Sequence, residues 1–127
     1  MKELHYTTSI NPLPILQVVD KLDNRYIIQD NGEQITMEGV KAYKQLIVIL
    51  ENPITYENII AAIVNARYSS DDVTAITLNH LLTMHNEAEE DKKDEYVSEY
   101  NALQEWRNKA KEIAKDVLGY AQKQNMI

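Results

Sequence analysis

The most regular feature of the sequence is an apolar pattern near the C-terminus. Two interleaved rows of apolar side chains each repeat every seven residues, the first at Tyr96, Leu103, Ala110 and Val117 and the second at Trp106, Ile113 and Tyr120. A repeat of this length places such rows along one side of an α-helix. Tyr100, Ala114 and Ala121 widen that side, as packing on a globular core requires. The pattern predicts a long C-terminal helix, against which the rest of the fold has to pack.

Two shorter helices are predicted upstream, and each begins with a capping side chain. Thr55 follows the helix-breaking pair Asn52-Pro53 and precedes an apolar face, formed by Tyr56, Ile59, Ile60, Ile63 and Val64. The run Ser69–Asp72 combines the end of that helix with the N-cap of the next. The next helix has apolar residues on two sides, Val73, Ile76, Leu81 and Met84 on one and Leu78 and Leu82 on the other. An apolar circumference this wide predicts that the helix lies between other elements.

Residues 38 to 50 are predicted to form a further helix. Apolar residues recur there at three- and four-residue steps, at Val40, Tyr43, Leu46, Ile47 and Leu50. Thr36 is a suitable N-cap, and Glu38 would lie in the first turn, near the positive end of the helix. A buried strand at Leu46–Leu50 is the alternative, because a short apolar run fits either structure.

Residues 1 to 37 carry strand and turn signals. The prolines of Asn11–Pro14 disfavour helical geometry in the residues before them, so this stretch is an extended entry. Short β-branched and aromatic runs predict three strands, at Ile15–Val19, Tyr26–Ile28 and Gln34–Thr36. Asp23-Asn24 indicates a tight turn, and Asn31-Gly32 indicates the type I′ turn of a β-hairpin. Three short strands are only marginally stable alone, so they have to pack on the helices.

These segments together predict a single α+β domain over residues 1–127. A small antiparallel β-hairpin or meander, at about residues 14–37, packs on three or four helices, and residues 38–127 are mainly helical with the long helix last. A chain of this size buries roughly two-thirds of the surface that it exposes when unfolded. The fold therefore needs no metal ion or disulfide to stabilise it.

Charge and composition argue against several classes of function. Twenty acidic residues against thirteen basic ones give a net charge of −7, which disfavours nucleic acid and anionic membranes as partners. The absence of cysteine excludes thiol catalysis and disulfides, and no glycine-rich phosphate motif is present. The first residues lack the apolar run of a signal peptide, and Leu46–Leu50 is far too short to span a membrane. We expect a cytoplasmic or virion-associated protein.

No residue pattern indicates catalytic or metal-binding chemistry. His80 and His85 are five residues apart, which on a helix turns their side chains in different directions and prevents a shared metal ion. Residues 86–95 contain six acids and two lysines, which predicts a solvated loop and helix start. A cation or partner site is the alternative for that stretch. We predict a protein without enzymatic activity, metal or cofactor.

Aromatic residues are the candidates for contact with a protein partner. The chain has eight tyrosines and one tryptophan but no phenylalanine, and tyrosine suits surfaces that are half buried and half wet. The residues proposed for an interface are Tyr26, Tyr43, Tyr68 and Trp106. Because the two rows of the last helix span more arc than one packing partner needs, one row, with Trp106, is predicted to be an association surface. Burial of Trp106 in the core is the alternative.

A family resemblance covers a little over half of the chain. It rests on Tyr56–Val64, then Ala66–Asp72, an acidic break, and Glu99–Ala102 leading into the helix that ends at Val117-Leu118. In this order of features, from Thr55 onward, the chain resembles the XkdW-like proteins and related tail-accessory proteins encoded in phage and prophage tail regions. The resemblance implies a role in the virion or in tail assembly without catalysis, and it implies no particular functional residues.

The sequence therefore leads to three hypotheses of function. The first is a non-catalytic structural or interaction protein, a phage or prophage tail-region accessory in tail or baseplate assembly. Its expected partners are proteins, including tail components and further copies of itself. The second is a bacterial regulatory adaptor that binds another protein through its acidic helical face. The third is a small-ligand enzyme whose site is assembled from scattered residues.

Overall fold

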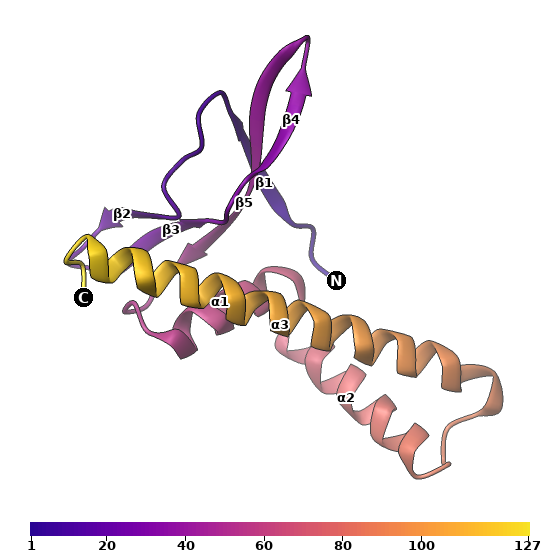
Figure 1. Cartoon of the computed structure of the whole chain (residues 1–127). Coiled ribbons are helices and arrows are strands. Elements are labelled where there is room, and N and C mark those ends of the chain that lie inside the picture. The colour runs from indigo at the N-terminus through magenta and orange to yellow at the C-terminus, as the bar shows by residue number, and fades with distance from the viewer.

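A five-stranded antiparallel sheet and three α-helices make up the protein (Figure 1). The structure, a computed structural model, describes all of residues 1–127. The strands are β1 (His5–Ser9), β2 (Leu16–Asp20), β3 (Arg25–Gln29), β4 (Glu33–Met37) and β5 (Val40–Leu50). The helices are α1 (Tyr56–Arg67), α2 (Ser70–Met84) and α3 (Lys93–Lys123), with a 3-10 turn, η1 (Glu90–Lys92), directly before α3. The predicted α+β class, with antiparallel strands and a long C-terminal helix, is confirmed.

β5 is the central strand of the sheet, and it occupies the segment predicted as a helix. β1 pairs with one of its edges, and β3 and β4 pair with the other. Leu46, Val48 and Leu50 are buried and Ile49 is exposed, which is the two-residue period of a strand. The helix prediction for residues 38–50 is therefore wrong, and its alternative, a strand at Leu46–Leu50, is correct. Pairing with strands on both edges decides the structure here, and no local pattern reveals those partners.

The predicted hairpin turn at Asn31-Gly32 is a β-bulge instead. β3 and β4 do not pair with each other but follow one another along the same edge of β5. Asp30, Asn31 and Gly32 lie opposite only two residues of β5, Gln45 and Leu46, so one extra residue is inserted. The Oδ1 atom of Asp30 accepts a hydrogen bond from Leu46 N at 2.9 Å, which replaces a missing bond of the ladder.

Glycine at position 32 allows two parts of the sheet to approach closely. A Cβ atom on Gly32 would lie 2.8 Å from Cγ of Gln45, closer than real Cβ atoms come to a neighbour. The side chain of Gln45 is buried, and its amide bonds to the backbone of Leu13 and Asp30, so it has little freedom to move away. The glycine is thus required by close packing and not by the positive φ of a hairpin turn.

Two other turns connect the paired strands. The turn predicted at Asp23-Asn24 is confirmed, since it joins β2 to β3 and Asn24 has a φ of 50°. The turn between β4 and β5 is Glu38-Gly39, with φ values of 50° and 79°. Two successive residues with positive φ are typical of a type I′ turn. Thr36, predicted as a helix N-cap, lies in β4 immediately before this turn.

The hydrophobic core lies between the sheet and the helices α1 and α3. The contribution of α3 comes from both of its seven-residue rows and from the alanines that widen them, at Leu103, Trp106, Ala110, Ile113, Ala114, Val117 and Ala121. Trp106 is only 8% exposed, and its Nε1 atom donates a hydrogen bond to Ile63 O at 3.0 Å. The association surface predicted on this helix is therefore wrong for Trp106, and the alternative, a core tryptophan, is correct.

α2 and the first third of α3 extend away from the sheet, at the lower right of Figure 1. We call residues 70–102 the arm; they comprise α2, the connection to α3 and the part of α3 before Leu103, its first buried residue. We call the remainder of the chain the body. α2 packs along α3 and has no buried residue of its own. The prediction that this helix lies between other elements is wrong, because neither the sheet nor α1 extends alongside it (Figure 1).

Candidate interaction surface

The aromatic residues predicted for partner contact do not form a common surface. Tyr26, Tyr68 and Trp106 are buried in the hydrophobic core. Tyr43 is partly buried in β5. Tyrosine and tryptophan suit a core as well as an interface when their polar atom forms a hydrogen bond. The Nε1 atom of Trp106 does so, because it donates to Ile63 O. The prediction is thus corrected for the three buried residues, because each has less than a tenth of its surface exposed.

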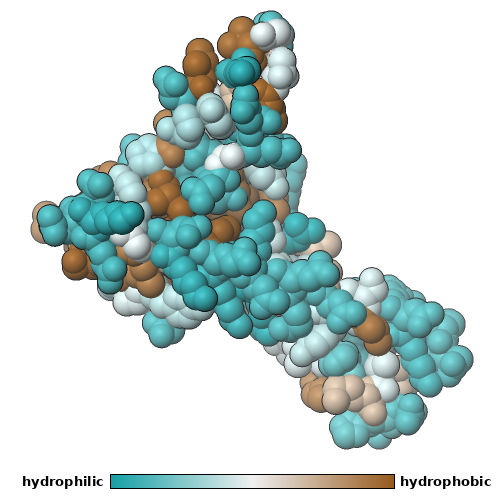
Figure 2. All heavy atoms as spheres, in the orientation of Figure 1, coloured by the Kyte–Doolittle hydropathy of each residue, from teal (hydrophilic) through white to brown (hydrophobic).

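An exposed apolar surface lies on α2 instead. Leu78, Leu81 and Leu82 are spaced at i, i+3 and i+4, which places them on one side of the helix. Their exposed fractions are 55%, 42% and 39%, and we call these three residues the leucine face. Figure 2 shows apolar surface on the arm among hydrophilic side chains. The sequence assigns Leu78 and Leu82 to a second apolar side of this helix and Leu81 to the first, but which sides are covered by neighbours is a property of the tertiary structure.

The opposite side of α2 is the one that contacts the rest of the protein. His80 stacks on Tyr100 of α3, with ring centroids 3.7 Å apart and ring planes 2° from parallel. Val73 and Ile76 pack against the hydrophobic core at the base of the arm. Because a helix turns about 100° per residue, Leu78 and Leu82 lie about half a turn away from these three residues, and Leu81 lies about a quarter of a turn from Val73 and His80. α3 therefore leaves the leucine face uncovered.

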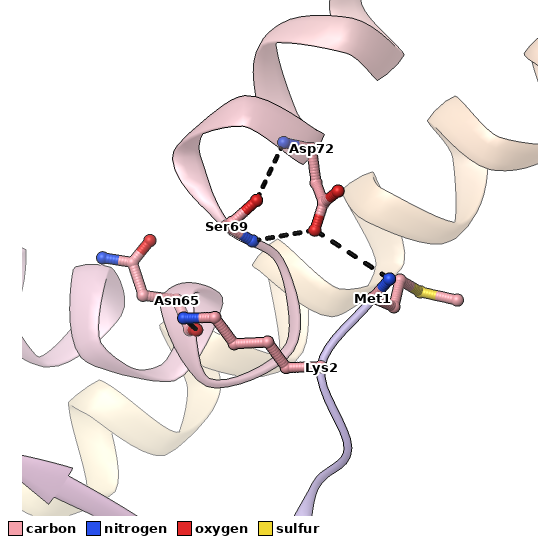
Figure 3. A network of polar contacts seen from close by, with 5 residues as sticks. All are labelled: Met1, Lys2, Asn65, Ser69 and Asp72. Atoms are coloured by element: carbon pink, nitrogen blue, oxygen red, sulfur yellow. Dashed lines mark hydrogen bonds and ion pairs between the residues drawn. The ribbon is translucent and has the colours of Figure 1, made fainter.

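The base of the arm is held by a network of polar contacts (Figure 3). Ser69 is the N-cap of α2 and forms a capping box with Asp72: Ser69 Oγ accepts from Asp72 N at 3.1 Å, and Asp72 Oδ2 accepts from Ser69 N at 3.0 Å. These bonds hold the pKa of Asp72 below its usual value. Lys2 adds hydrogen bonds to the end of α1, from its Nζ to Asn65 O at 2.8 Å and from its backbone N to Arg67 O at 2.7 Å. The network fixes the direction in which α2 leaves the body.

Charge is distributed very unevenly between the arm and the body. Residues 70–102 contain nine acidic residues and two basic ones, both lysines, whereas the body contains eleven acidic and eleven basic residues, so the whole net charge of −7 lies on the arm. Both lysines of the arm are engaged locally, Lys92 with Glu95 at 3.4 Å and Lys93 with Glu90 at 2.9 Å. The leucine face is thus an apolar stripe on a strongly acidic projection.

A hollow of about 470 Å³ lies at the junction of α2 and α3. Its polar lining includes Asp72, Asn79, Ser98 and Glu99. The carboxylate of Asp72 is already engaged in the capping box. None of the three histidines lines the hollow, and His80 stacks on Tyr100 instead. The arrangement places no histidine beside these acids that could exchange a proton with them.

Neither a metal site nor a related protein of known function is found for this chain. No group of three or more histidine or carboxylate side chains comes together in a way that could hold a metal ion. No family model matches the chain, and no curated protein or solved structure matches it either. None of the helices combines the length and the apolar character that crossing a bilayer requires. The leucine face and the charge of the arm are therefore the features from which function is inferred.

Proposed function

We propose that this protein is a non-catalytic interaction protein that binds another protein through its arm, and that it acts as an accessory in the assembly of a phage or prophage tail or baseplate. The observation that supports binding is the leucine face, three exposed leucines on one side of a projecting helix. Burying a fully exposed leucine side chain contributes about 1.5–3 kcal/mol, and the leucines of this face, which are 39–55% exposed, each offer roughly half of that gain. A partner that covers all three thus gains a substantial part of the free energy of a stable complex.

The geometry of the arm favours recognition of a folded or helical partner. α2 begins immediately after α1, with only Tyr68 and Ser69 between them, and the capping box fixes its start. The leucine face is thus presented on a defined helix and not on a loop, which reduces the entropy lost on binding. The i, i+3, i+4 spacing is the one by which helices bind in apolar grooves or against other helices.

Capture from the native host tests the interaction. Tagged wild-type protein, the triple variant Leu78→Ser/Leu81→Ser/Leu82→Ser and the control Leu22→Ser are purified, and bound proteins are identified by mass spectrometry. Leu22 lies in the turn between β2 and β3 and is 95% exposed, so it matches the change in chemistry outside the arm. We expect a partner that wild type and Leu22→Ser retain and the triple variant loses. The same bound proteins in all three samples would show the arm to be irrelevant to binding.

The assignment to a tail region is supported by the resemblance of residues 56–72 and 99–118 to XkdW-like and related tail-accessory proteins. Tail or baseplate genes are expected beside the gene that encodes this chain, and tail components are expected among the captured partners. Neighbouring genes of other processes, together with a partner unrelated to tails, would favour the regulatory adaptor.

A further inference from the structure

The leucine face lies between two acidic ends of α2. Asp71 and Asp72 are in the first turn of the helix. At the other end the chain turns back, and the backbone N–H groups of Glu87 and Ala88 donate to Leu82 O at 2.8 and 3.3 Å. This contact holds Glu87 and Ala88 against the last turn of α2, so the acidic stretch Glu87–Asp91 begins beside Leu82. Since α2 itself contains no lysine or arginine, a partner that covers the leucine face meets negative charge at both ends.

This charge excludes several occupants of the leucine face. Two arms from two copies of the chain would each bring a charge of −7 to the contact, and like charges oppose association. The two lysines that could offset this repulsion, Lys92 and Lys93, are paired with Glu95 and Glu90 in the same arm. Nucleic acids and anionic lipid surfaces are repelled for the same reason. The occupant has to be both apolar and basic.

We propose that the leucine face binds a basic amphipathic helix of a partner protein, an inference that rests on the proposed interaction function. The apolar side of the partner helix covers Leu78, Leu81 and Leu82. Its lysines and arginines lie opposite Asp71 at one end and Glu87–Asp91 at the other. α2 has 15 residues and is about 22 Å long, which matches two heptads of a partner helix. Opposite charge accelerates the association and makes it sensitive to salt.

Two designed peptides test the chemistry of the partner with the full-length protein. Both carry leucine at the same heptad positions on one side, and the remaining positions are lysine in one peptide and glutamate in the other. Binding is measured by fluorescence anisotropy at about 0.02 M and about 0.5 M salt, conditions between which the screening length falls several-fold. We expect the lysine peptide to bind at least ~10-fold more tightly than the glutamate peptide and to lose about 10-fold in affinity at high salt.

Variants of the protein show whether the lysine peptide binds at the leucine face or is only attracted to the acidic surface of the arm. Leu78→Ser/Leu81→Ser/Leu82→Ser is expected to weaken binding of the lysine peptide at least ~10-fold, whereas Leu22→Ser leaves it unchanged. Glu87→Gln/Glu89→Gln is expected to weaken binding and to flatten its salt dependence. The matched pair Glu3→Gln/Glu51→Gln, two exposed acids of the body, is expected to have no effect. Circular dichroism of each variant verifies that the helical content is unchanged.

Three outcomes would overturn the inference. Equal affinity for the two peptides would show that charge does not select the partner. Lysine-peptide binding that survives the leucine substitutions would show attraction to acidic surface without use of the leucine face. Dimerisation of the wild type, seen by light scattering and abolished by the leucine substitutions, would identify a second copy as the occupant. If host proteins still bind through the leucine face in any of these cases, the proposed function stands and only the basic helix is wrong.

Discussion

The helices α1 and α2 have similar local designs and very different surroundings. Each begins with a hydroxyl N-cap, Thr55 or Ser69, that accepts a hydrogen bond from the backbone three residues later. Each carries several branched apolar side chains. α1 buries three residues, Ile59, Ile63 and Val64, whereas α2 buries none. Capping thus follows from the local sequence, whereas burial depends on which elements lie alongside the helix.

This difference separates the part of the chain that stabilises the fold from the part that is free to bind. Apolar residues of α1 contribute to the core, where their burial stabilises the body. The leucines of α2 contribute little to folding because they remain exposed, so a partner gains the free energy of covering them. Substitutions in the two regions should therefore have opposite effects on stability and binding.

The largest effect is expected at the junction of α1 and α3. Trp106→Ala should lower the free energy of unfolding by about 3–5 kcal/mol, because it removes a buried indole and leaves Ile63 O without its hydrogen bond. Urea denaturation followed by circular dichroism measures the loss. Trp106→Phe, which keeps most of the apolar volume, should lose less. An alanine variant as stable as wild type would contradict the assignment of Trp106 to the core.

A pair of alanine substitutions tests the comparison of α1 with α2 directly. Ile63→Ala should lower the free energy of unfolding by about 2–5 kcal/mol, because Ile63 is fully buried. Leu81→Ala should change it by no more than about 0.5 kcal/mol, because Leu81 is exposed. Urea denaturation of the two variants and of wild type measures both changes in the free energy of unfolding. Similar losses at both positions would mean that the leucine face is covered within the protein itself.

The two N-caps are expected to stabilise different parts of the protein, Thr55 the whole body and Ser69 mainly α2. Removal of a capping hydroxyl costs about 1 kcal/mol. Thr55→Ala should lower the free energy of global unfolding, because α1 is part of the core. Ser69→Ala should mainly accelerate hydrogen exchange in α2, because that helix can open while the body stays folded. Ser70→Ala, next to the cap, serves as the control, and faster exchange throughout the body of Ser69→Ala would indicate that the arm and body unfold as one unit.

The smallest effect concerns the pH dependence of the arm. The hydrogen bonds of Ser69 lower the pKa of Asp72 from its usual 3.8, so the ionised carboxylate stabilises the folded arm. This contribution is complete above pH 3.8 and is lost as the pH falls through the lowered pKa. Asp72→Asn should reduce protection of α2 at neutral pH, and the difference from wild type should shrink in acid. This difference is measured by hydrogen exchange of the α2 amides, corrected for the pH dependence of the intrinsic exchange rate.

Asp30 in the body provides a control of opposite sign. Burial raises the pKa of Asp30, although its hydrogen bond from Leu46 N acts in the other direction. The carboxylate of Asp30 therefore takes up a proton more readily in the folded body than in the unfolded chain. As a consequence, the contribution of Asp30 to stability increases as the pH falls through the raised pKa. Asp30→Asn keeps the acceptor for Leu46 N and should not destabilise the body at neutral pH. A marked loss of stability would show that the charge itself is needed in the bulge.

Much of the helical part of the fold could be predicted because its signals are local. The caps Thr55 and Ser69 and the rows of the last helix are all confirmed. The turn at Asp23-Asn24 is confirmed as well. Each of these features depends on hydrogen bonds or side-chain spacing within a few residues of the chain. Of the candidate site, the sequence predicted only an acidic helical face, in the alternative of a regulatory adaptor. Three of the aromatic residues predicted for partner contact are buried, and Tyr43, partly buried in β5, stays a prediction.

The N-caps of α1 and α2, the apolar rows of α3 and the turn at Asp23-Asn24 follow from short stretches of the sequence. Contacts between distant segments make residues 40–50 a strand and Asn31-Gly32 part of a bulge, and they bury Trp106 but not Leu78. The physical reason is the range of the interactions. A cap is satisfied by a backbone group three residues away, whereas the partners of β5 and the cover of an apolar side chain come from distant segments of the chain.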